Sequence, residues 1–405
     1  MKNLKKIVCL LLVLSTLFIG TLTINLNALT DVIQYNEKNL VYISDNENIT
    51  ENITTRENDK DVKVDLNNLK SKDIDKVKTK KFKNICVDST TYENAEIKQT
   101  LKDQLNNGAK IIIRKDKMSV KEIYQYFDIK SNSDVPNTID EDGNDKLKVV
   151  AVSIKRDNLG EIHTEVISVE DFTNDQSIKK AIAYSVIHNT NTNPTEKQET
   201  ALIGFSNNVA NATGLTWNPV ASNTWIDYWD TITVSYSVVL QKNPSSPDIQ
   251  GKYYTMVYSS VDVQPKDGYL YKDVYFRHTG NTDATIYDFG PSSTSSTDTI
   301  NIGFSYPTPA ISMSADIGIT SGISIPEGGI GSSSVKWDFY PVALYLKQFS
   351  FRAARFTISS EFYQKSQFYK GSLNYSIEVY KYQSAGNGYY CATASRTDRS
   401  VSNIL

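Results

Sequence analysis

The clearest alternation of hydrophobic and polar positions along the chain runs from residue 299 to residue 325. Two alternating stretches are separated by Pro307, Thr308 and Pro309. Because successive side chains of a strand point to opposite faces, this pattern predicts two amphipathic β-strands joined by a turn. Ser, Thr and Gly dominate one face of the second strand, and its apolar face would carry Ile311, Met313, Ile317, Ile319, Ile323 and Ile325.

Upstream of this stretch, helical and strand patterns alternate. Apolar residues at helical spacing predict helices at 92–107 and 175–188, and Ser119 and Glu122 have the spacing of a capping box that opens a third helix. Strands are predicted at 82–88, 109–114, 147–155 and 161–169. We therefore expect a small α/β domain at residues 82–193.

From residue 194 onward the pattern becomes all-β. Short alternating runs recur between glycine, proline and polar residues, and they predict strands at 226–240, 252–263, 269–276, 335–339, 343–351, 355–362 and 373–382. This spacing is typical of an antiparallel β-domain, either sandwich-like or elongated. We place that domain at 194–383 and a polar C-terminal tail at 384–405, so the expected fold class is α+β overall.

Residues 1–28 have the organisation of a secretory signal peptide. Lys2, Lys5 and Lys6 precede an apolar core at 7–22, and Ala28 is a small residue at the predicted cleavage site. The alternative is a retained membrane anchor, but polar sequence follows at once and no comparable apolar run recurs. We expect a secreted, extracellular protein, with residues 29–81 so polar that they predict a disordered linker or pro-region.

Charge and cysteine content narrow the range of partners. Removal of the signal takes away three lysines and lowers the formal net charge by three, from −3 to about −6, and the sequence has no basic stripe. Nucleic acid is therefore not an expected partner. Cys86 and Cys391 would remain, and the sequence is compatible both with one disulfide bond between them and with two separate thiols. The richness in Lys, Asn, Ile and Tyr resembles secreted proteins of low-GC Gram-positive bacteria.

No arrangement of residues in the sequence predicts catalysis. His163, His188 and His278 lie outside any nucleophile-elbow pattern, and no zinc signature is present. The acidic run at 140–145 resembles the start of a calcium loop, but its glycine comes too early and Ala151 replaces the bidentate glutamate. We therefore expect no catalytic residue, no metal site and no cofactor.

Trp225, Asp227 and Trp229 form a candidate ligand-binding ledge. They alternate with Ile226 and Tyr228, which we expect to continue the apolar face of the next strand. The ledge would then lie on the other face, where two indoles beside a carboxylate can stack on a sugar and bind its hydroxyl groups. Two other interpretations stay open. The indoles could cover the junction with the α/β domain, or carboxylates on neighbouring strands could form a glycosidase pair.

The 299–325 stretch also permits a membrane function. A spanning β-strand needs about 9–11 residues that alternate between lipid-facing and lumen-facing positions. Between residues 299 and 335 the only charged residues are Asp316 and Glu327, and Asp316 has the parity of the polar face. The pattern resembles the stem segments of secreted β-barrel pore-forming toxins, which implies a hairpin that leaves the soluble fold and inserts. The alternative is an ordinary hairpin with its polar face in water.

These patterns favour a secreted, non-catalytic binding or interaction protein acting at the cell exterior, with a cell-surface glycan or protein as its candidate partner. The first alternative is a membrane-active, pore-forming protein that inserts the 299–325 hairpin. The second is a carbohydrate-binding protein or glycosidase that uses residues 225–230.

Overall fold

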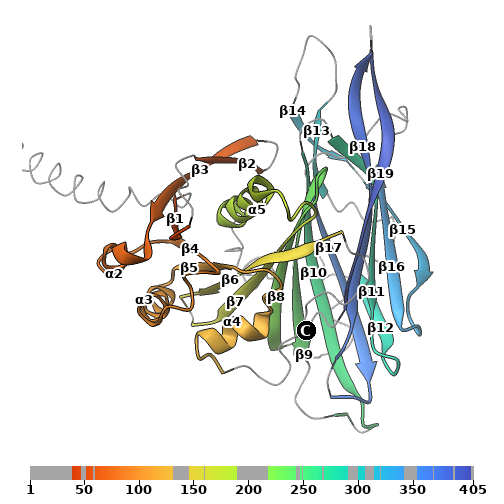
Figure 1. Cartoon of the computed structure of the whole chain (residues 1–405). Coiled ribbons are helices and arrows are strands. Elements are labelled where there is room, and N and C mark those ends of the chain that lie inside the picture. The colour runs from red at the N-terminus through yellow and green to blue at the C-terminus, as the bar shows by residue number, and fades with distance from the viewer. Residues whose placement is uncertain are drawn as a thin grey trace, which may run out of the picture.

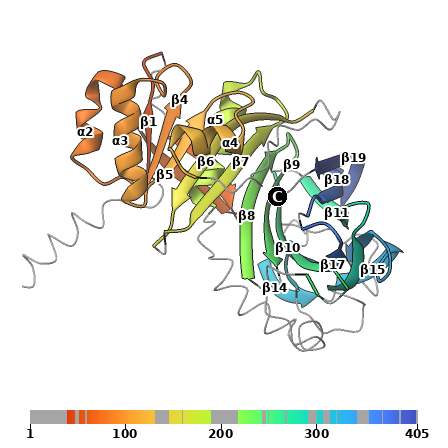
Figure 2. The same cartoon turned by 90° about the horizontal axis from the view of Figure 1, so that it is seen from below.

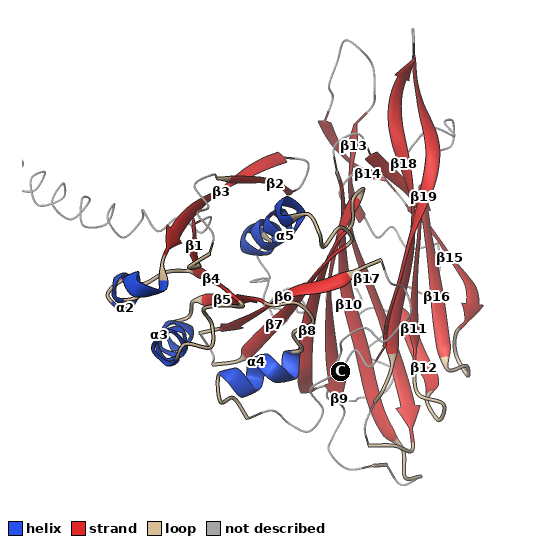
Figure 3. Ribbon diagram, in the orientation of Figure 1, coloured by secondary structure: helices blue, strands red, loops and turns tan. Residues whose placement is uncertain are grey.

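The structure is a computed structural model. It describes residues 39–46, 52–57, 60–130, 146–158, 160–188, 218–242, 247–248, 250–266, 269–290, 300–305, 314–319, 321–341, 354–367, 369–385 and 388–402. Strands dominate these residues, and helices are few (Figure 3). The β-rich architecture expected from the sequence is therefore confirmed.

A twelve-stranded sheet runs through most of the described chain (Figure 1). In spatial order its strands are β12 (Thr285–Gly290), β17 (Ala354–Gln364), β10 (Tyr253–Pro265), β9 (Ile232–Lys242), β8 (Asn218–Tyr228), β7 (Ile162–Val169), β6 (Lys148–Arg156), β5 (Lys110–Arg114), β4 (Asn84–Asp88), β1 (Asn39–Ile43), β3 (Lys60–Leu69) and β2 (Ile53–Glu57). Parallel pairing of β7 with β8, in the register Val166↔Trp225, joins its N-terminal and C-terminal halves. The two predicted domains thus share one continuous sheet.

Two smaller antiparallel sheets complete the β-structure. The five-stranded sheet has the order β15 (Ser321–Gly328), β16 (Ser334–Pro341), β11 (Tyr269–Thr279), β18 (Ser372–Ala385) and β19 (Gly388–Ser402). The two-stranded sheet consists of β13 (Ile300–Ser305) and β14 (Ser314–Ile319).

The helices of the described residues lie on the N-terminal half, and α3, α4 and α5 begin at side chains that accept hydrogen bonds from their first turns. They are η1 (Ser71–Asp73), α2 (Asp75–Lys78), α3 (Ala95–Asn106), α4 (Val120–Tyr126) and α5 (Asp175–Ile187). Asn94 caps α3, Asn174 caps α5, and Ser119 and Glu122 form the predicted capping box of α4. Such caps satisfy backbone N–H groups that have no partner inside the helix. The three helices expected from the sequence are confirmed.

Both faces of the N-terminal half are covered. Ile97 and Leu101 of α3 pack in one hydrophobic cluster with alternate residues of β4 and β5, such as Ile85 and Ile111. Ile182 of α5 packs in a second cluster on the opposite face, with Cys86 and Ile112. The near-continuous apolar runs of β4 and β5 follow from this two-sided burial.

In the C-terminal half the five-stranded sheet faces β8, β9, β10 and β17, and the two sheets form a sandwich (Figure 2). Aromatic rings fill the space between them. Phe356 of β17 lies 5.4 Å from Phe276 and 5.0 Å from Phe339, measured between ring centroids. The core of the β-domain is therefore built from the inner faces of both sheets, as in aligned sandwiches.

Residues 39–46 and 52–81 were expected to belong to a disordered linker, and that expectation is wrong wherever the structure describes them. Leu40, Val41, Tyr42 and Ile43 of β1 are buried, and β1 pairs in parallel with both β3 and β4. The average composition of this segment concealed one short apolar run. A strand inserted into an existing sheet gains ladder hydrogen bonds on both edges and needs few apolar residues.

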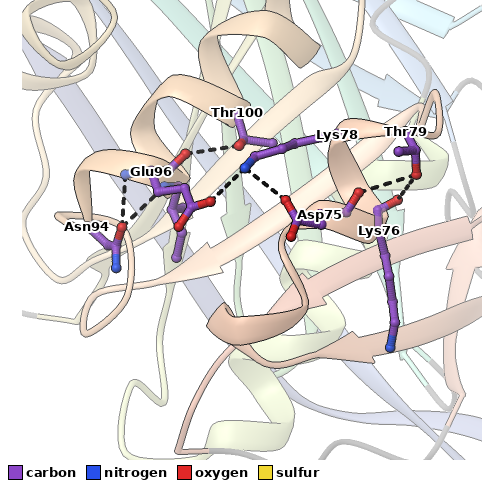
Figure 4. A network of polar contacts seen from close by, with 8 residues as sticks. Asp75, Lys76, Lys78, Thr79, Asn94, Glu96 and Thr100 are labelled. Carbon is purple, nitrogen blue, oxygen red and sulfur yellow. Dashed lines mark hydrogen bonds and ion pairs between the residues drawn. The ribbon is translucent and has the colours of Figure 1, made fainter.

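Polar contacts fasten the rest of that segment to the helical layer (Figure 4). Lys78 Nζ donates to Asp75 Oδ1 at 2.9 Å and to Glu96 Oε1 of α3 at 2.6 Å. Asn94 Oδ1 accepts from the Glu96 backbone N–H at 2.9 Å, so Glu96 takes part both in the cap of α3 and in the ion pair with α2.

The polar tail predicted at 384–405 is also corrected, because β19 pairs with β18 along residues 388–402.

Candidate functional site

The strongest sequence pattern lies in a sheet of its own. In the register of β13 and β14, Ile300, Ile302 and Phe304 are directly opposite Ile319, Ile317 and Ala315. The intervening pairs are Asn301↔Gly318, Gly303↔Asp316 and Ser305↔Ser314. Directly opposite residues share a face of the ladder, so apolar and polar positions fall on separate faces of this hairpin.

The second predicted strand of the hairpin is divided in two. Ile317 and Ile319 belong to β14, whereas Ile323 and Ile325 belong to β15, where Ile323 is opposite Phe339 of β16. β14 ends at Ile319, and β15 begins at Ser321. The expectation of one strand from 311 to 325 is therefore corrected. The predicted turn, with Ile311 and Met313, lies outside the described residues.

The hairpin links the edges of the two large sheets. Before it, β12 is the edge strand of the twelve-stranded sheet, and after it, β15 is an edge strand of the five-stranded sheet. β13 also lies beside β17 while belonging to a different sheet. The hairpin therefore comes between two edge strands in the sequence, and its described strands are not inserted between paired strands of either large sheet.

The tryptophan ledge is corrected, because the structure buries it inside the sandwich. Trp225 and Trp229 are each 2% exposed, and Asp227 is 0% exposed. Trp229 Nε1 donates to the Tyr375 hydroxyl at 3.0 Å, and that hydroxyl donates to Asp227 Oδ2 at 2.7 Å. The trio thus packs against a strand of the opposite sheet, and a sugar has no access to it.

The expected parity failed at the turn between β8 and β9. Trp225 is directly opposite Tyr236 in the ladder, and their rings stack at 5.2 Å with 10° between their planes. Odd positions of β8 therefore share a face with even positions of β9. Ile226 and Tyr228 face away from the sandwich, and Tyr228 joins the cluster beneath α5. The turn reverses the numbering parity, which cannot be read from alternation within either strand.

The candidate bridge between Cys86 and Cys391 is also corrected. Cys86 carries a thiol and is buried in β4 beneath α5. Cys391 lies in β19, opposite Tyr382 of β18 in the register of the five-stranded sheet. The two strands lie in different halves of the molecule (Figure 1), whereas a disulfide needs Cα atoms within about 7 Å.

The histidines described by the structure serve packing and hydrogen bonding. His278 of β11 is fully buried, with Nε2 at 2.8 Å from Ser259 Oγ and Nδ1 at 2.7 Å from Ser360 Oγ. Both serines belong to the opposing sheet, so this imidazole bridges the sandwich. Burial lowers the pKa of His278 to about 3, which keeps the ring neutral. Within the described residues, no group of three or more His, Cys, Asp or Glu side chains could hold a metal ion.

Several cross-strand contacts could not be predicted from the sequence, because they depend on strand register. Asp288 of β12 is directly opposite Glu361 of β17, and Tyr254 of β10 is directly opposite Tyr363 of β17. Glu165 of β7 is 3% exposed and forms an ion pair with Lys110 at 2.6 Å. Alternation within a strand gives no signal for such cross-strand pairs.

Comparisons with known proteins give no family for this chain. No family model matches it, and no curated protein matches its sequence. Solved structures that resemble it include a pore forming protein at 8% identity, with a TM-score of 0.27, covering 46% of this chain and 94% of that one. Clostridium perfringens delta-toxin has 8% identity and a TM-score of 0.26, covering 46% of this chain and 85% of that one.

The collagen-binding subdomain of the Enterococcus faecalis surface protein ACE resembles the chain at 9% identity and a TM-score of 0.18, covering 36% of this chain and 84% of that one. TM-scores this low do not establish a shared fold. None of the helices in the described part of the chain is long and apolar enough to cross a membrane.

Proposed function

We propose that this chain is a secreted, non-catalytic protein that binds at the cell exterior and inserts the β13–β14 hairpin into a lipid bilayer. The observation that carries the proposal is that the hairpin forms a separate two-stranded sheet, which comes between the edge strands β12 and β15 in the sequence. Secretion rests on the signal-like sequence of residues 1–28.

Because the hairpin forms a sheet of its own, its release from the fold has a low cost in free energy. A strand in the middle of a sheet must break ladders on both edges before it can leave. β13 and β14 are paired with each other, so moving them together preserves their mutual hydrogen bonds. Segments that move in a functional transition belong to the less strongly held parts of a fold. Release of the hairpin would therefore leave the sandwich ladders intact.

The register of the hairpin suits a bilayer. All apolar positions of the two arms share one face, which can contact lipid, while Asn301, Gly303, Ser305, Ser314 and Asp316 share the other. Each arm has six residues in the structure, fewer than the about 9–11 that a spanning strand needs. Insertion would therefore recruit sequence on either side of the arms.

A single inserted hairpin would be incomplete. Its two outer edges would expose backbone N–H and C=O groups to hydrocarbon, at a cost of several kcal/mol for each group. Side-by-side pairing of hairpins from several copies removes that cost. The proposal therefore includes oligomerisation on the membrane.

Release of a fluorescent dye from liposomes tests this function. Ile317→Asp places a carboxylate on the apolar face of β14 and is expected to reduce the rate of release at least about tenfold, because a charged group facing lipid is costly. Ser314→Asp makes the same addition on the polar face of the same strand and is expected to retain release. Both variants should keep the thermal unfolding midpoint of the parent protein.

Absence of release by the signal-processed parent protein across neutral, anionic and sterol-containing liposomes would overturn the proposal. Equal activity of the Ile317→Asp and Ser314→Asp variants would also overturn it, because the two faces of the hairpin would then be equivalent.

A further inference from the structure

Three tyrosines gather at the outer corner of the twelve-stranded sheet, where β10, β17 and β12 meet. Tyr254 is directly opposite Tyr363, with 6.4 Å between ring centroids. The Tyr287 ring stands at 89° to that of Tyr254, with 6.3 Å between centroids. Tyr287 is 41% exposed, so this corner is open to solvent. The two perpendicular rings present an aromatic face and an aromatic edge at this corner.

Two charged side chains contact these rings, one through a hydrogen bond and the other over an aromatic face. The Tyr254 hydroxyl donates to Asp248 Oδ2 at 3.0 Å, and Asp248 is held by the backbone N–H groups of Gln250 and Lys252. Lys252 Nζ lies 4.2 Å from the centroid of the Tyr363 ring. The corner thus already holds one ammonium group against an aromatic face.

Two carboxylates follow the rings along the same strands. Glu361 is two positions from Tyr363, so both share a face of β17, and Asp288 is directly opposite Glu361 on β12. Glu361 is only 3% exposed, and among the described residues no hydrogen bond or ion pair offsets its burial. Burial and the nearby Asp288 carboxylate raise the pKa of Glu361 to about 7. No cation of the described residues compensates this acid.

We propose that Tyr254, Tyr287 and Tyr363, with Glu361 and Asp288, bind an organic ammonium ion, and that a quaternary ammonium such as the choline head group fits best. Aromatic faces favour large, weakly hydrated cations, and the buried Glu361 carboxylate with the half-buried Asp288 opposite it supplies the balancing charge. Ca²⁺ fits less well, because it takes six to eight oxygen ligands. The site does not depend on the hairpin or on membrane insertion.

Titration of the full-length, signal-processed protein with tetramethylammonium, followed by NMR or calorimetry, tests the site. Glu361→Gln and Tyr287→Ala should each weaken binding about tenfold. Phe172→Ala is the matched control, because Phe172 is 43% exposed and also has a lysine, Lys148, over its ring at 4.6 Å. That variant should bind like the parent protein.

Binding should strengthen from pH 6 to pH 8, because Glu361 must lose its proton to face a cation. The other charged groups at this corner are Asp288, Asp248 and Lys252. Hydrogen bonds from the backbone N–H groups of Lys252 and Gln250 lower the pKa of Asp248, so Asp248 stays negative, and Asp288, whose pKa is raised by burial, would act in the same direction as Glu361. The Glu361→Gln variant should therefore show a weaker dependence on pH.

Vesicles separate the two sources of such a cation. If Glu361→Gln and Tyr287→Ala also lose retention on phosphatidylcholine vesicles, the ligand is a lipid head group; if they bind vesicles normally but not tetramethylammonium, it is a soluble ammonium compound. Absence of tetramethylammonium binding by the parent protein overturns the proposal. Binding that Na⁺ displaces equally well, or that survives both substitutions, also overturns it.

Discussion

At the scale of residues, β17 places two buried polar positions next to each other on opposite faces. Ser360 faces the sandwich interior and bonds His278, so that both imidazole nitrogens have partners. Glu361 faces the outer side, where no described residue offers it a hydrogen bond or an ion pair. The titrations of His278 and Glu361 therefore change the free energy of unfolding in opposite directions as the pH changes. His278 stabilises the fold above its unfolded pKa near 6.5, and this contribution is lost as pH falls toward 3.

Glu361 gives a prediction of the opposite sign. Its folded pKa, about 7, lies above the ordinary value of 4.5. The buried charge therefore lowers the free energy of unfolding at high pH, and this destabilisation disappears as pH falls from 7 to 4.5. Glu361→Gln should raise the free energy of unfolding by about 2 kcal/mol at pH 8 and by much less at pH 5.

Denaturant unfolding at the two pH values measures this difference. Because the Gln variant lacks the opposing effect of Glu361, its stability should fall as pH decreases from 7 to 5, following His278. A gain of equal size at both pH values would contradict the assignment of a buried, destabilising charge. Glu378→Gln, on the five-stranded sheet, is the control substitution.

At the scale of elements, the β13–β14 hairpin differs from the neighbouring strands of the sequence because its arms pair in a sheet of their own. Its arms pair with each other, whereas β12 and β15 are each bound into a large sheet along one edge. Edge strands tolerate change beside them better than central strands do, because their outer edge carries no ladder.

Replacing residues 300–319 with a short Gly/Ser linker should therefore preserve the fold. We expect the thermal unfolding midpoint to change by only a few degrees and liposome release to be abolished. Retained release would show that another segment inserts. A large loss of stability would show that the hairpin is part of the sandwich core.

At the scale of the whole molecule, the twelve-stranded sheet passes from the helical half into the sandwich without a break at the β7–β8 pairing. One hydrophobic cluster also extends from Ile97 of α3 to Trp337 of β16 along one face of that sheet. Continuous pairing and packing predict that the two halves unfold together in one cooperative transition.

Tryptophan fluorescence can test this cooperativity, because all four tryptophans of the chain lie after residue 216. Ile112→Ala removes a fully buried side chain of β5 in the N-terminal half and should cost about 2–5 kcal/mol. In a single cooperative unit this loss shifts the unfolding midpoint reported by the tryptophans. An unchanged tryptophan midpoint with a shifted far-UV signal would show that the halves unfold independently.

The sequence by itself determined the local structure of this protein. Alternation located β13, the arm of β14 and most strands of the sandwich, and capping residues located α3, α4 and α5, because the period of burial and the first turn of a helix depend on near neighbours in the chain. The segregation of apolar and polar residues in the hairpin could be read in the same way.

Only the tertiary structure decided which faces meet. It placed Trp225, Asp227 and Trp229 inside the sandwich, made β1 part of a large sheet, and separated Cys86 from Cys391. It also brought Asp288 opposite Glu361 and placed the hairpin in a sheet of its own. The physical reason is register. Alternation fixes two faces for each strand, but turns and pairing between distant strands determine which face is covered and by what.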